Sequence, residues 1–251
     1  MKIVVIGGTG LIGSKVVEHL TEHGHEAVAA SPNSGVNTIT GEGLSEVLVG
    51  ANVVVDVSNS PSFADDDVLA FFTTSTTNLL AAEREAGVTH HVALSIVGAE
   101  LLPDSGYLRA KVAQEQLIEE SGLPYSIVRA TQFYEFMGRI ADEVTVDGVA
   151  RVSTGLMQPI AAADVSATVA RVAAGEPLNG TLEIGGPQRT GQDELVRTVL
   201  AAKGDTRAVI SDPDAPYFGT KLSGGELTPG EDAELSTTSF SDWLAAQAPV
   251  K

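Results

Sequence analysis

A tyrosine and a lysine four positions apart, Tyr107 and Lys111, are the residues of this chain best suited to acid–base chemistry. At this spacing the two side chains share one face of a helix, about one turn apart. A phenol has an ordinary pKa of about 10, and a neighbouring ammonium favours the phenolate and lowers that pKa. We therefore expect Tyr107 to act as a general acid towards a carbonyl that receives hydride, and as a base in the reverse direction.

The amino terminus carries a glycine pattern suited to holding a diphosphate. An apolar strand at residues 2–6 runs into glycines spaced G-x-x-G-x-x-G and then into a helix. Gly7 can adopt the backbone angles of a tight turn, Gly10 lets a phosphate approach the main chain, and Gly13 lets the helix pack close to the strand. The free N–H groups at the helix start then face the anion. The expected contacts are Gly7, Thr9, Gly10, Leu11, Ile12 and Gly13.

The order of the residues after the glycines excludes a nucleoside triphosphatase. Gly8 and Gly13 have the glycine separation of a P-loop, but Ser14-Lys15 follows them where that loop has Lys-Ser or Lys-Thr. The ammonium is therefore one position late on the helix.

Alternating strands and helices position these motifs in the first half of the chain. The strands are near-continuous runs of Val, Ile and Ala, which is typical of a parallel sheet covered on both faces. Together with the helices between them, they predict an α/β fold with a Rossmann-type doubly wound parallel sheet. We expect strands at 2–6, 26–30, 52–57, 89–95 and 125–130, and helices at 11–23, 43–49, 62–86 and 107–121.

The alternation of strands and helices becomes less regular after residue 130, and no linker or internal repeat stands out there. We expect one integrated domain over 1–251. Within it, 1–130 forms the dinucleotide-binding core, and 131–251 forms mainly a small C-terminal substrate-covering lobe with returning core elements. The elements expected there are helices at 132–142, 161–174, 192–203 and 240–247, strands at 181–184 and 207–210, and a pair of strands within 144–153.

Composition excludes several classes of function. The net charge of −18, from 33 acidic and 15 basic residues, repels nucleic acid and anionic membranes. With no cysteine there is no disulfide, thiol nucleophile or thiolate metal site, and we expect no metal. No apolar run reaches the length of a membrane span, and a strand starting at residue 2 leaves no room for a signal peptide. These features favour a cytoplasmic protein. For the histidines we expect structural or surface roles.

Several motifs resemble the short-chain dehydrogenase/reductase superfamily, in particular its atypical branch of NmrA-like proteins and small NAD(P)H-binding reductases. Besides the glycine turn and the Tyr107/Lys111 pair, the resemblance rests on the sequence from Asn78 to Ser95 and on three shorter segments. These are GLPYSIVR at 122–129, QPIAAAD at 158–164 and GTLEIGGP at 180–187. It covers nearly the whole chain and is specific for the superfamily, not for a substrate.

The resemblance implies a nicotinamide cofactor that lies across the strand ends. Ser58 and Asn59 would pass the adenosine ribose or the phosphates, and Tyr107 and Lys111 match the catalytic pair, with Lys111 also bonding ribose hydroxyls. The serine of the family lies one or two positions beyond Ser95, where this chain has Ile96 and Val97, so Ser95 is either the carbonyl-binding serine or a structural one. The residues expected to line the substrate pocket are Gln132, Phe133, Tyr134 and Phe136.

The end of the second strand bears on the choice of cofactor. An NAD enzyme usually has a carboxylate there for the ribose 2′-hydroxyl, and residues 29–34 contain none. Ser31, Asn33 and Ser34 could donate to a 2′-phosphate, although no arginine accompanies them. We therefore favour NADP(H) and keep NAD(H) as the alternative.

The expected function is NAD(P)H-dependent reduction of a small carbonyl or quinone-like compound by hydride transfer, with Tyr107 as proton donor. The apolar Ile96 and Val97 keep open a non-catalytic NAD(P)-binding sensor, and a nucleotide-sugar epimerase or dehydratase is a third reading. The expected partner is a small-molecule substrate, with no nucleic acid and no membrane. By analogy with such folds, helices 62–86 and 107–121 are candidates for a homodimer interface.

Overall fold

A computed structural model describes residues 1–247, and the chain divides into two compact units. The first unit consists of residues 1–129 and 165–182, and the second of residues 130–164 and 183–251. The chain therefore leaves the first unit after residue 129 and returns to it for 165–182.

A seven-stranded sheet in the order β14-β9-β5-β4-β3-β1-β2 is the framework of the fold. Strand β1 lies between β3 and β2 in parallel register, with Ile3 opposite Val53 and Ala27. The chain begins at β1, adds β2 on one side of it, and then adds β3, β4 and β5 on the other side. This is the doubly wound arrangement that the sequence predicted. The strands are β1 (Lys2–Ile6), β2 (Glu26–Ala30), β3 (Val53–Asp56), β4 (His90–Ile96), β5 (Tyr125–Ala130), β9 (Gly180–Gly185) and β14 (Glu234–Leu235).

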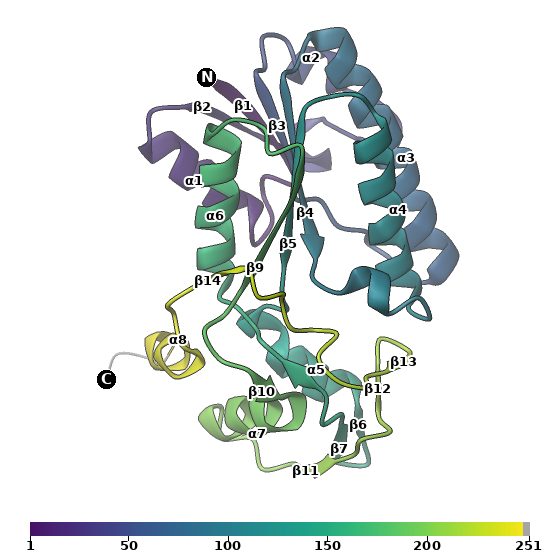
Figure 1. The fold of residues 1–251 in the computed structure, drawn as a ribbon, viewed down its shortest axis with the longest axis vertical. Coiled ribbons are helices and arrows are strands. Elements are labelled where there is room, and N and C mark those ends of the chain that lie inside the picture. Colours follow the sequence, from purple (N-terminus) through teal and green to yellow (C-terminus); the bar gives the residue numbers. More distant parts are fainter. Residues whose placement is uncertain (248–251) are drawn as a thin grey trace. The chain divides into compact units, whose positions relative to one another are not determined.

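Helices cover both faces of the sheet in the first unit (Figure 1). Helices α1 (Gly13–Glu22) and α6 (Ala162–Ala174) lie on one face, and α3 (Asp65–Ala86) and α4 (Gly106–Glu120) on the other. A short helix, α2 (Leu44–Val47), precedes β3. Because both faces are covered, every residue of β3 is buried, which explains its unbroken apolar sequence before the final aspartate.

The core of the first unit joins the sheet to α2 and α3. Val4, Val54 and Leu79 are fully buried in one cluster with Leu48. Burying each of these side chains contributes about 1.5–3 kcal/mol relative to leaving it exposed.

The long helix α3 starts three residues later than expected and ends where expected. Its first turn is Asp65-Asp66-Asp67, whose carboxylates favour the positive end of the helix dipole. The residues before it form a loop in which the Ser62 hydroxyl donates to Asp67 over 2.8 Å. Gly87, at φ +73°, ends the helix in the left-handed conformation.

The second unit contains short elements and two longer helices. Parallel pairing joins β7 to β11, while β6 and β7 pair antiparallel as expected. The expected helix at 132–142 begins late because Phe133 is extended and bridges Ile160. The elements are η3 (Tyr134–Phe136), α5 (Met137–Glu143), β6 (Thr145–Val146), β7 (Val149–Val152), β8 (Leu156–Met157), β10 (Thr190–Gly191), α7 (Gln192–Ala202), β11 (Ala208–Ser211), β12 (Pro216–Tyr217), β13 (Thr220–Lys221) and α8 (Phe240–Gln247).

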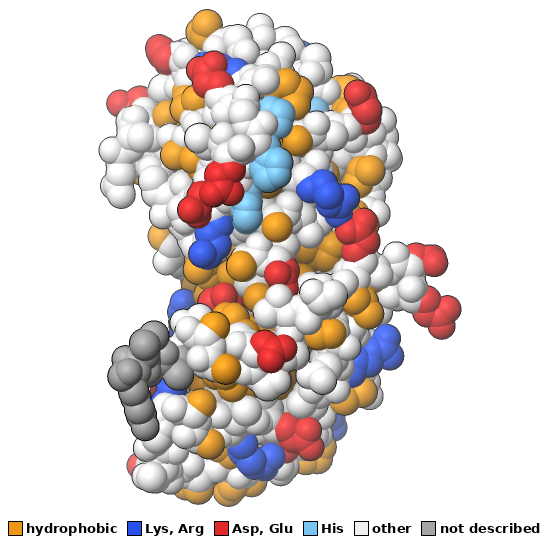
Figure 2. All heavy atoms as spheres, turned by 90° about the vertical axis from the view of Figure 1, so that its left-hand side faces the viewer, with side chains coloured by type: hydrophobic (Ala, Val, Ile, Leu, Met, Phe, Trp, Pro, Cys, Tyr) orange, Lys and Arg blue, Asp and Glu red, His pale blue; other side chains and the backbone are white. Residues whose placement is uncertain are grey.

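The surface carries histidines on the face of the first unit that bears α1 (Figure 2). In residues 1–247, no group of three or more His, Cys, Asp or Glu side chains is arranged to hold a metal ion. Within the same residues, no helix is both long and apolar enough to cross a membrane.

Candidate active site

The glycine turn between β1 and α1 is held by the ends of two neighbouring strands. Gly7 has φ +77°, and its N–H donates to the Ala30 carbonyl at the end of β2 over 2.9 Å. A Cβ at Gly7 would lie 2.9 Å from the Ser58 nitrogen and from the Val57 oxygen, just after β3. Only glycine satisfies both the backbone angle and this close approach.

The other glycines of the turn differ in the space around them. A Cβ at Gly13 would lie 2.2 Å from the Gly7 oxygen, so glycine is needed for the helix to start against the turn. Gly8, which the sequence analysis considered only for its P-loop spacing, packs on β2, where a Cβ would lie 2.7 Å from Ala29 Cα. A Cβ at Gly10 would meet only the Gly7 oxygen, at 3.3 Å. One side of the turn is therefore packed, and the side at Gly10 is open.

Unpaired amides lie on this turn at the start of α1. Among the described residues, the N–H groups of Thr9, Leu11 and Ile12 donate to no protein acceptor. The first turn of α1 contains no acidic side chain, so nothing neutralises the positive end of the helix dipole. These open amides lie beside Gly10, where the turn leaves space for a ligand. Such an arrangement fits the diphosphate of a dinucleotide.

Three of the expected cofactor residues follow the end of β2, and they differ in burial and in hydrogen bonding. Ser31 is buried, and its Oγ forms no hydrogen bond within residues 1–247. The Ser34 hydroxyl donates to the Ser31 carbonyl and accepts from the Ser31 N–H, both over 2.9 Å, so it already serves the local turn. Asn33 is exposed. Ser31 and Asn33 therefore keep the free polar atoms at this strand end.

The residues after β3 bring polar groups towards Tyr107. The Asp56 carboxylate accepts from the Ser58 N–H over 3.0 Å and from the Ser58 hydroxyl over 2.6 Å. Asn59 Oδ1 accepts from the Ser60 N–H over 3.0 Å and from the Tyr107 hydroxyl over 3.1 Å. Of the two expected cofactor residues after β3, Asn59 therefore contacts the expected proton donor, and Ser58 precedes it in the same turn.

The phenol of Tyr107 is more firmly protonated than the sequence suggested. Burial raises the pKa of Tyr107 to about 12, and the hydrogen bond to Asn59 lowers it only in part. The expectation that Lys111 lowers this pKa is wrong in this structure, because desolvation of the phenolate dominates. Two aromatic rings pack around the phenol, with centroids 5.4 Å (Phe63) and 6.1 Å (Phe72) from the Tyr107 ring.

Lys111 is 3% exposed, and its ammonium points into the protein. Its Nζ donates to the Leu94 carbonyl over 2.9 Å and to Gln114 Oε1, and it lies 4.4 Å from the centre of the Phe72 ring. Burial lowers the pKa of Lys111 to about 8, while the charges of Asp56 and Glu115 act to raise it. Phe72 contacts both members of the pair, so Tyr107 and Lys111 do share a helix face.

Ser95 lies on β4, directly after the residue whose carbonyl holds Lys111. It is 3% exposed, and its Oγ has no hydrogen-bond partner in the described part of the chain. Val97, at one of the positions where the superfamily has its serine, is buried and apolar. Ser95 is therefore a buried hydroxyl one residue after the carbonyl that accepts from Lys111.

The four expected substrate residues lie in the second unit and have unlike surroundings. The rings of Phe133 and Phe136 stack with centroids 5.5 Å apart, and Phe136 is exposed. Gln132 Oε1 is buried without a partner among residues 1–247. Tyr134 is 2% exposed, packs against Phe240 and Trp243, and donates its hydroxyl to the Thr238 carbonyl. Tyr134 is thus a core residue, and we leave it out of the proposed substrate contacts.

Sequence reasoning missed two buried polar residues that are linked to the Tyr107/Lys111 pair, Asp56 and Gln114. Gln114 is 1% exposed, and its Nε2 donates to Asp56 Oδ2 over 3.0 Å. A polar residue at the end of an apolar strand, and a glutamine three positions after Lys111, were the available signals. Their pairing is a contact between residues 58 positions apart, which no local pattern shows.

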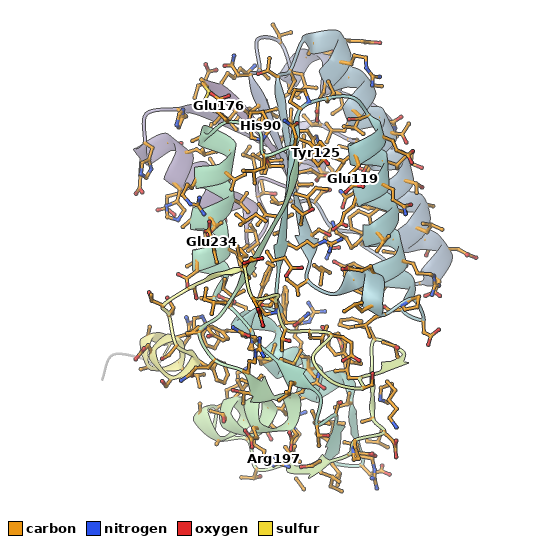
Figure 3. All side chains as sticks on the ribbon, viewed as in Figure 1. His90, Glu119, Tyr125, Glu176, Arg197 and Glu234 are labelled. Atoms are coloured by element: carbon orange, nitrogen blue, oxygen red, sulfur yellow. The ribbon has the colours of Figure 1, made fainter. Side chains whose placement is uncertain are left out.

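Two histidines on β4 have structural roles. His90 lies at the amino end of the strand, away from the glycine turn (Figure 3), and its Nε2 is 2.8 Å from the Ser126 hydroxyl. His91 and Glu83 form a hydrogen-bonded pair with neither side chain exposed.

Comparison with known proteins agrees with this geometry. The NAD(P)H-binding family matches residues 7–176 of the chain. Divinyl chlorophyllide a 8-vinyl-reductase of Cucumis sativus is 33% identical over 222 residues, which cover 74% of this chain and 52% of the relative. The chain spans about half the length of the curated relatives that it matches.

Solved structures show the same fold at low sequence identity. UDP-glucose 4-epimerase of Thermus thermophilus, complexed with NAD, has a TM-score of 0.69 at 20% identity and covers 98% of this chain and 92% of its own. NADPH-dependent quinone oxidoreductase of Escherichia coli, complexed with NADPH, has a TM-score of 0.66 at 20% identity and covers 84% and 77%. With its glycine turn and open amides, this chain belongs to the NAD(P)H-binding family, which agrees with the resemblance of its motifs to the short-chain dehydrogenase/reductase superfamily.

Proposed function

We propose that this protein is an NAD(P)H-dependent oxidoreductase that reduces a small carbonyl or quinone-like compound. The observation that carries the proposal is the hydrogen bond between the Tyr107 hydroxyl and Asn59, which places a protonated phenol beside the residues after β3. The match to the family and the reductase activity named for the cucumber relative support it.

The residues of the site would have separate roles in cofactor binding and proton transfer. The open amides of Leu11 and Ile12 hold the diphosphate, and Ser31 and Asn33 lie where the ribose of the adenosine half is held in this fold. The bound nicotinamide supplies the hydride. Tyr107 keeps its proton at neutral pH, because its pKa is raised to about 12, and gives it to the substrate oxygen. The Lys111 ammonium would bond the ribose hydroxyls of the cofactor, as the resemblance to the superfamily implies.

The test is to replace Tyr107 with Phe and to follow oxidation of NADPH and NADH with a panel of carbonyls and quinones. We expect a fall in kcat of about 10²- to 10⁴-fold, as for other general acids, with the Kd for the cofactor unchanged. Isothermal calorimetry of cofactor binding is the control. Equal turnover by the wild type and Tyr107→Phe would refute the proton-donor role.

One observation favours a second candidate, a non-catalytic NAD(P)-binding sensor. The Lys111 ammonium is bonded to Leu94 and Gln114 inside the protein, and Val97 offers the substrate no hydroxyl. The same panel separates the two functions. A sensor would bind one oxidation state of the cofactor more tightly and would show no turnover with any carbonyl or quinone of the panel.

A further inference from the structure

The carboxylate of Asp56 connects to both members of the Tyr107–Lys111 pair through separate hydrogen-bonded arms. It lies at the last position of β3 and is 1% exposed. Its two oxygens have different partners, so each can hold a different part of the site. The arms lie entirely within the first unit.

The first arm runs from Oδ1 to the phenol. Asp56 Oδ1 accepts from the N–H and the hydroxyl of Ser58, which fixes the chain directly after β3. The next residue, Asn59, accepts the Tyr107 hydroxyl at 3.1 Å. Where Asn59 lies, and so where the phenolic proton points, depends on this turn.

The second arm runs from Oδ2 to the ammonium. Asp56 Oδ2 accepts from Gln114 Nε2 over 3.0 Å, which forces the amide to present its oxygen on the other side. That oxygen accepts from Lys111 Nζ. An ionised carboxylate only accepts hydrogen bonds and an ammonium only donates them, so a glutamine bridge between them has one satisfactory orientation.

We propose that Asp56 is a positioning residue that sets both halves of the Tyr107–Lys111 pair, one oxygen through Ser58 and Asn59 and the other through Gln114. This inference rests on the proposed function for its kinetic consequence, and on the hydrogen bonds alone for its structural one. Asp56 itself touches neither Tyr107 nor Lys111 in these chains of bonds; it acts through Asn59 and Gln114.

Replacing the carboxylate with an amide reverses the second arm. In Asp56→Asn, the new side-chain NH₂ group faces Gln114 Nε2, and two donors cannot bond. Gln114 relieves the clash by turning over its amide, which then presents NH₂ to the Lys111 ammonium. Lys111 loses an acceptor and the nearby negative charge together. The Ser58 arm retains an acceptor, because the substituted side chain keeps one oxygen.

A second change should repair the first. In Asp56→Asn combined with Gln114→Glu, the new carboxylate accepts both from the amide introduced on β3 and from Lys111. The net charge equals that of the wild type, and every donor has an acceptor again. A residue that merely filled space or stabilised β3 would not be rescued in this way.

The direct readout is the pKa of Lys111, measured by NMR on lysine-labelled protein without cofactor, with the signal assigned through Lys111→Met. The groups that face this ammonium are Asp56 from β3 and Glu115 from α4, and Asp56 also interacts with Glu83 and His91. We expect a titration near pH 8 in the wild type, a lower value in Asp56→Asn, and a value at or above 8 in the double variant.

The kinetic readout is the split between kcat and KM. We expect kcat to fall about 10- to 100-fold in Asp56→Asn with a smaller change in KM, and to recover in the double variant, because misplaced reacting groups have effects of this size. Asp65→Asn is the matched control, since this exposed carboxylate pairs with Arg109 on the surface of α4. Circular dichroism melting checks that each variant is folded.

The two readouts separate this inference from the proposed function. If the wild type turns over no substrate, the reductase proposal fails, and the NMR titration still tests the Asp56 arms. An unchanged Lys111 titration in Asp56→Asn, or failure of Gln114→Glu to restore it, overturns the inference. Should Asp56→Asn fail to fold, Gln114→Met, which removes the bridge and keeps the carboxylate, is expected to lower the Lys111 pKa, and an unchanged value there overturns it as well.

Discussion

The Tyr107 hydroxyl donates to Asn59 Oδ1, which ties the first turn of α4 to the loop that follows β3. The bond spans 48 residues and gives the phenolic proton a defined direction. Burial and this acceptor act oppositely on the pKa of Tyr107, and burial is the larger effect. The phenol is therefore held protonated and oriented at neutral pH, although a pKa of about 12 makes it a weaker acid than an ordinary tyrosine.

The pH dependence of kcat should come from Lys111 and not from Tyr107. The pKa of Lys111 is lowered to about 8, so its ammonium is lost as the pH rises past that value, whereas Tyr107 stays protonated to about pH 12. We expect reductive turnover to decline above about pH 8. Steady-state kinetics between about pH 6 and 10 measure this.

Lys111→Arg is the control, because guanidinium keeps its charge over the whole range. The decline above about pH 8 should disappear in this variant, whatever its maximal rate. Persistence of the same alkaline limb would assign it to another group.

Alanine substitutions in the glycine turn should separate folding from cofactor binding. Gly13→Ala places a Cβ 2.2 Å from the Gly7 oxygen, so we expect it to destabilise the protein by about 1–3 kcal/mol. Gly10→Ala meets only one atom, at 3.3 Å, so its thermal unfolding should stay close to that of the wild type. Its cofactor affinity should fall about tenfold or more, because the methyl group occupies the phosphate side. Differential scanning calorimetry and binding calorimetry measure the two effects, and a Gly10→Ala protein with unchanged affinity would contradict this placement.

The sequence was sufficient where periodicity and local geometry decide the structure. The strands at 2–6, 26–30 and 125–130 and the helix at 240–247 have the predicted bounds. Two-residue strands such as Leu156–Met157 and Thr190–Gly191 were missed, because their pairing partners, not an alternating pattern, define them.

The site shows the same limit. The spacing of Tyr107 and Lys111 predicts a common face, and Phe72 does contact both. The spacing does not predict where the ammonium points, since this depends on Leu94 and Gln114, which come together only in the folded protein. For the same reason, the raised pKa of Tyr107 follows from burial, which local spacing does not reveal.

Asn33 offers a test of cofactor preference. It is exposed beside the buried Ser31 hydroxyl, and no charged residue occurs in 29–41. We expect NADP(H) to bind more tightly than NAD(H) in the wild type. Asn33→Arg should raise the affinity for NADPH about tenfold through a charge-assisted bond to the 2′-phosphate, and Asn33→Asp should lower it by like-charge repulsion. Calorimetric Kd values for both nucleotides decide, and equal effects on NADH and NADPH would place Asn33 away from the 2′ position.

The buried pair His91–Glu83 should make stability depend on pH. The pKa of Glu83 is raised chiefly by burial. For His91, burial is the largest single effect and lowers the pKa, but the charge and hydrogen bond of Glu83 together with the charge of Asp56 outweigh it, so the pKa of His91 is raised. A group whose pKa is higher in the folded state stabilises fully below its unfolded pKa and loses that effect as the pH rises through its folded pKa. His91 has an ordinary pKa of about 6.5. By the same rule, Glu83 begins to lose its contribution above its ordinary pKa of about 4.5. We therefore expect the free energy of unfolding to fall as the pH rises above about 4.5, and to fall further above about 6.5 through His91, as measured by urea denaturation.

Breaking this pair on one side should be worse than replacing both partners. In Glu83→Leu the buried imidazole keeps no acceptor, and we expect a loss of about 3–5 kcal/mol near neutral pH. Glu83→Leu combined with His91→Phe removes both polar groups, so it should be closer to the wild type in stability and should lack the decline above about pH 6.5. If the double variant keeps the full decline, the pair is not its source.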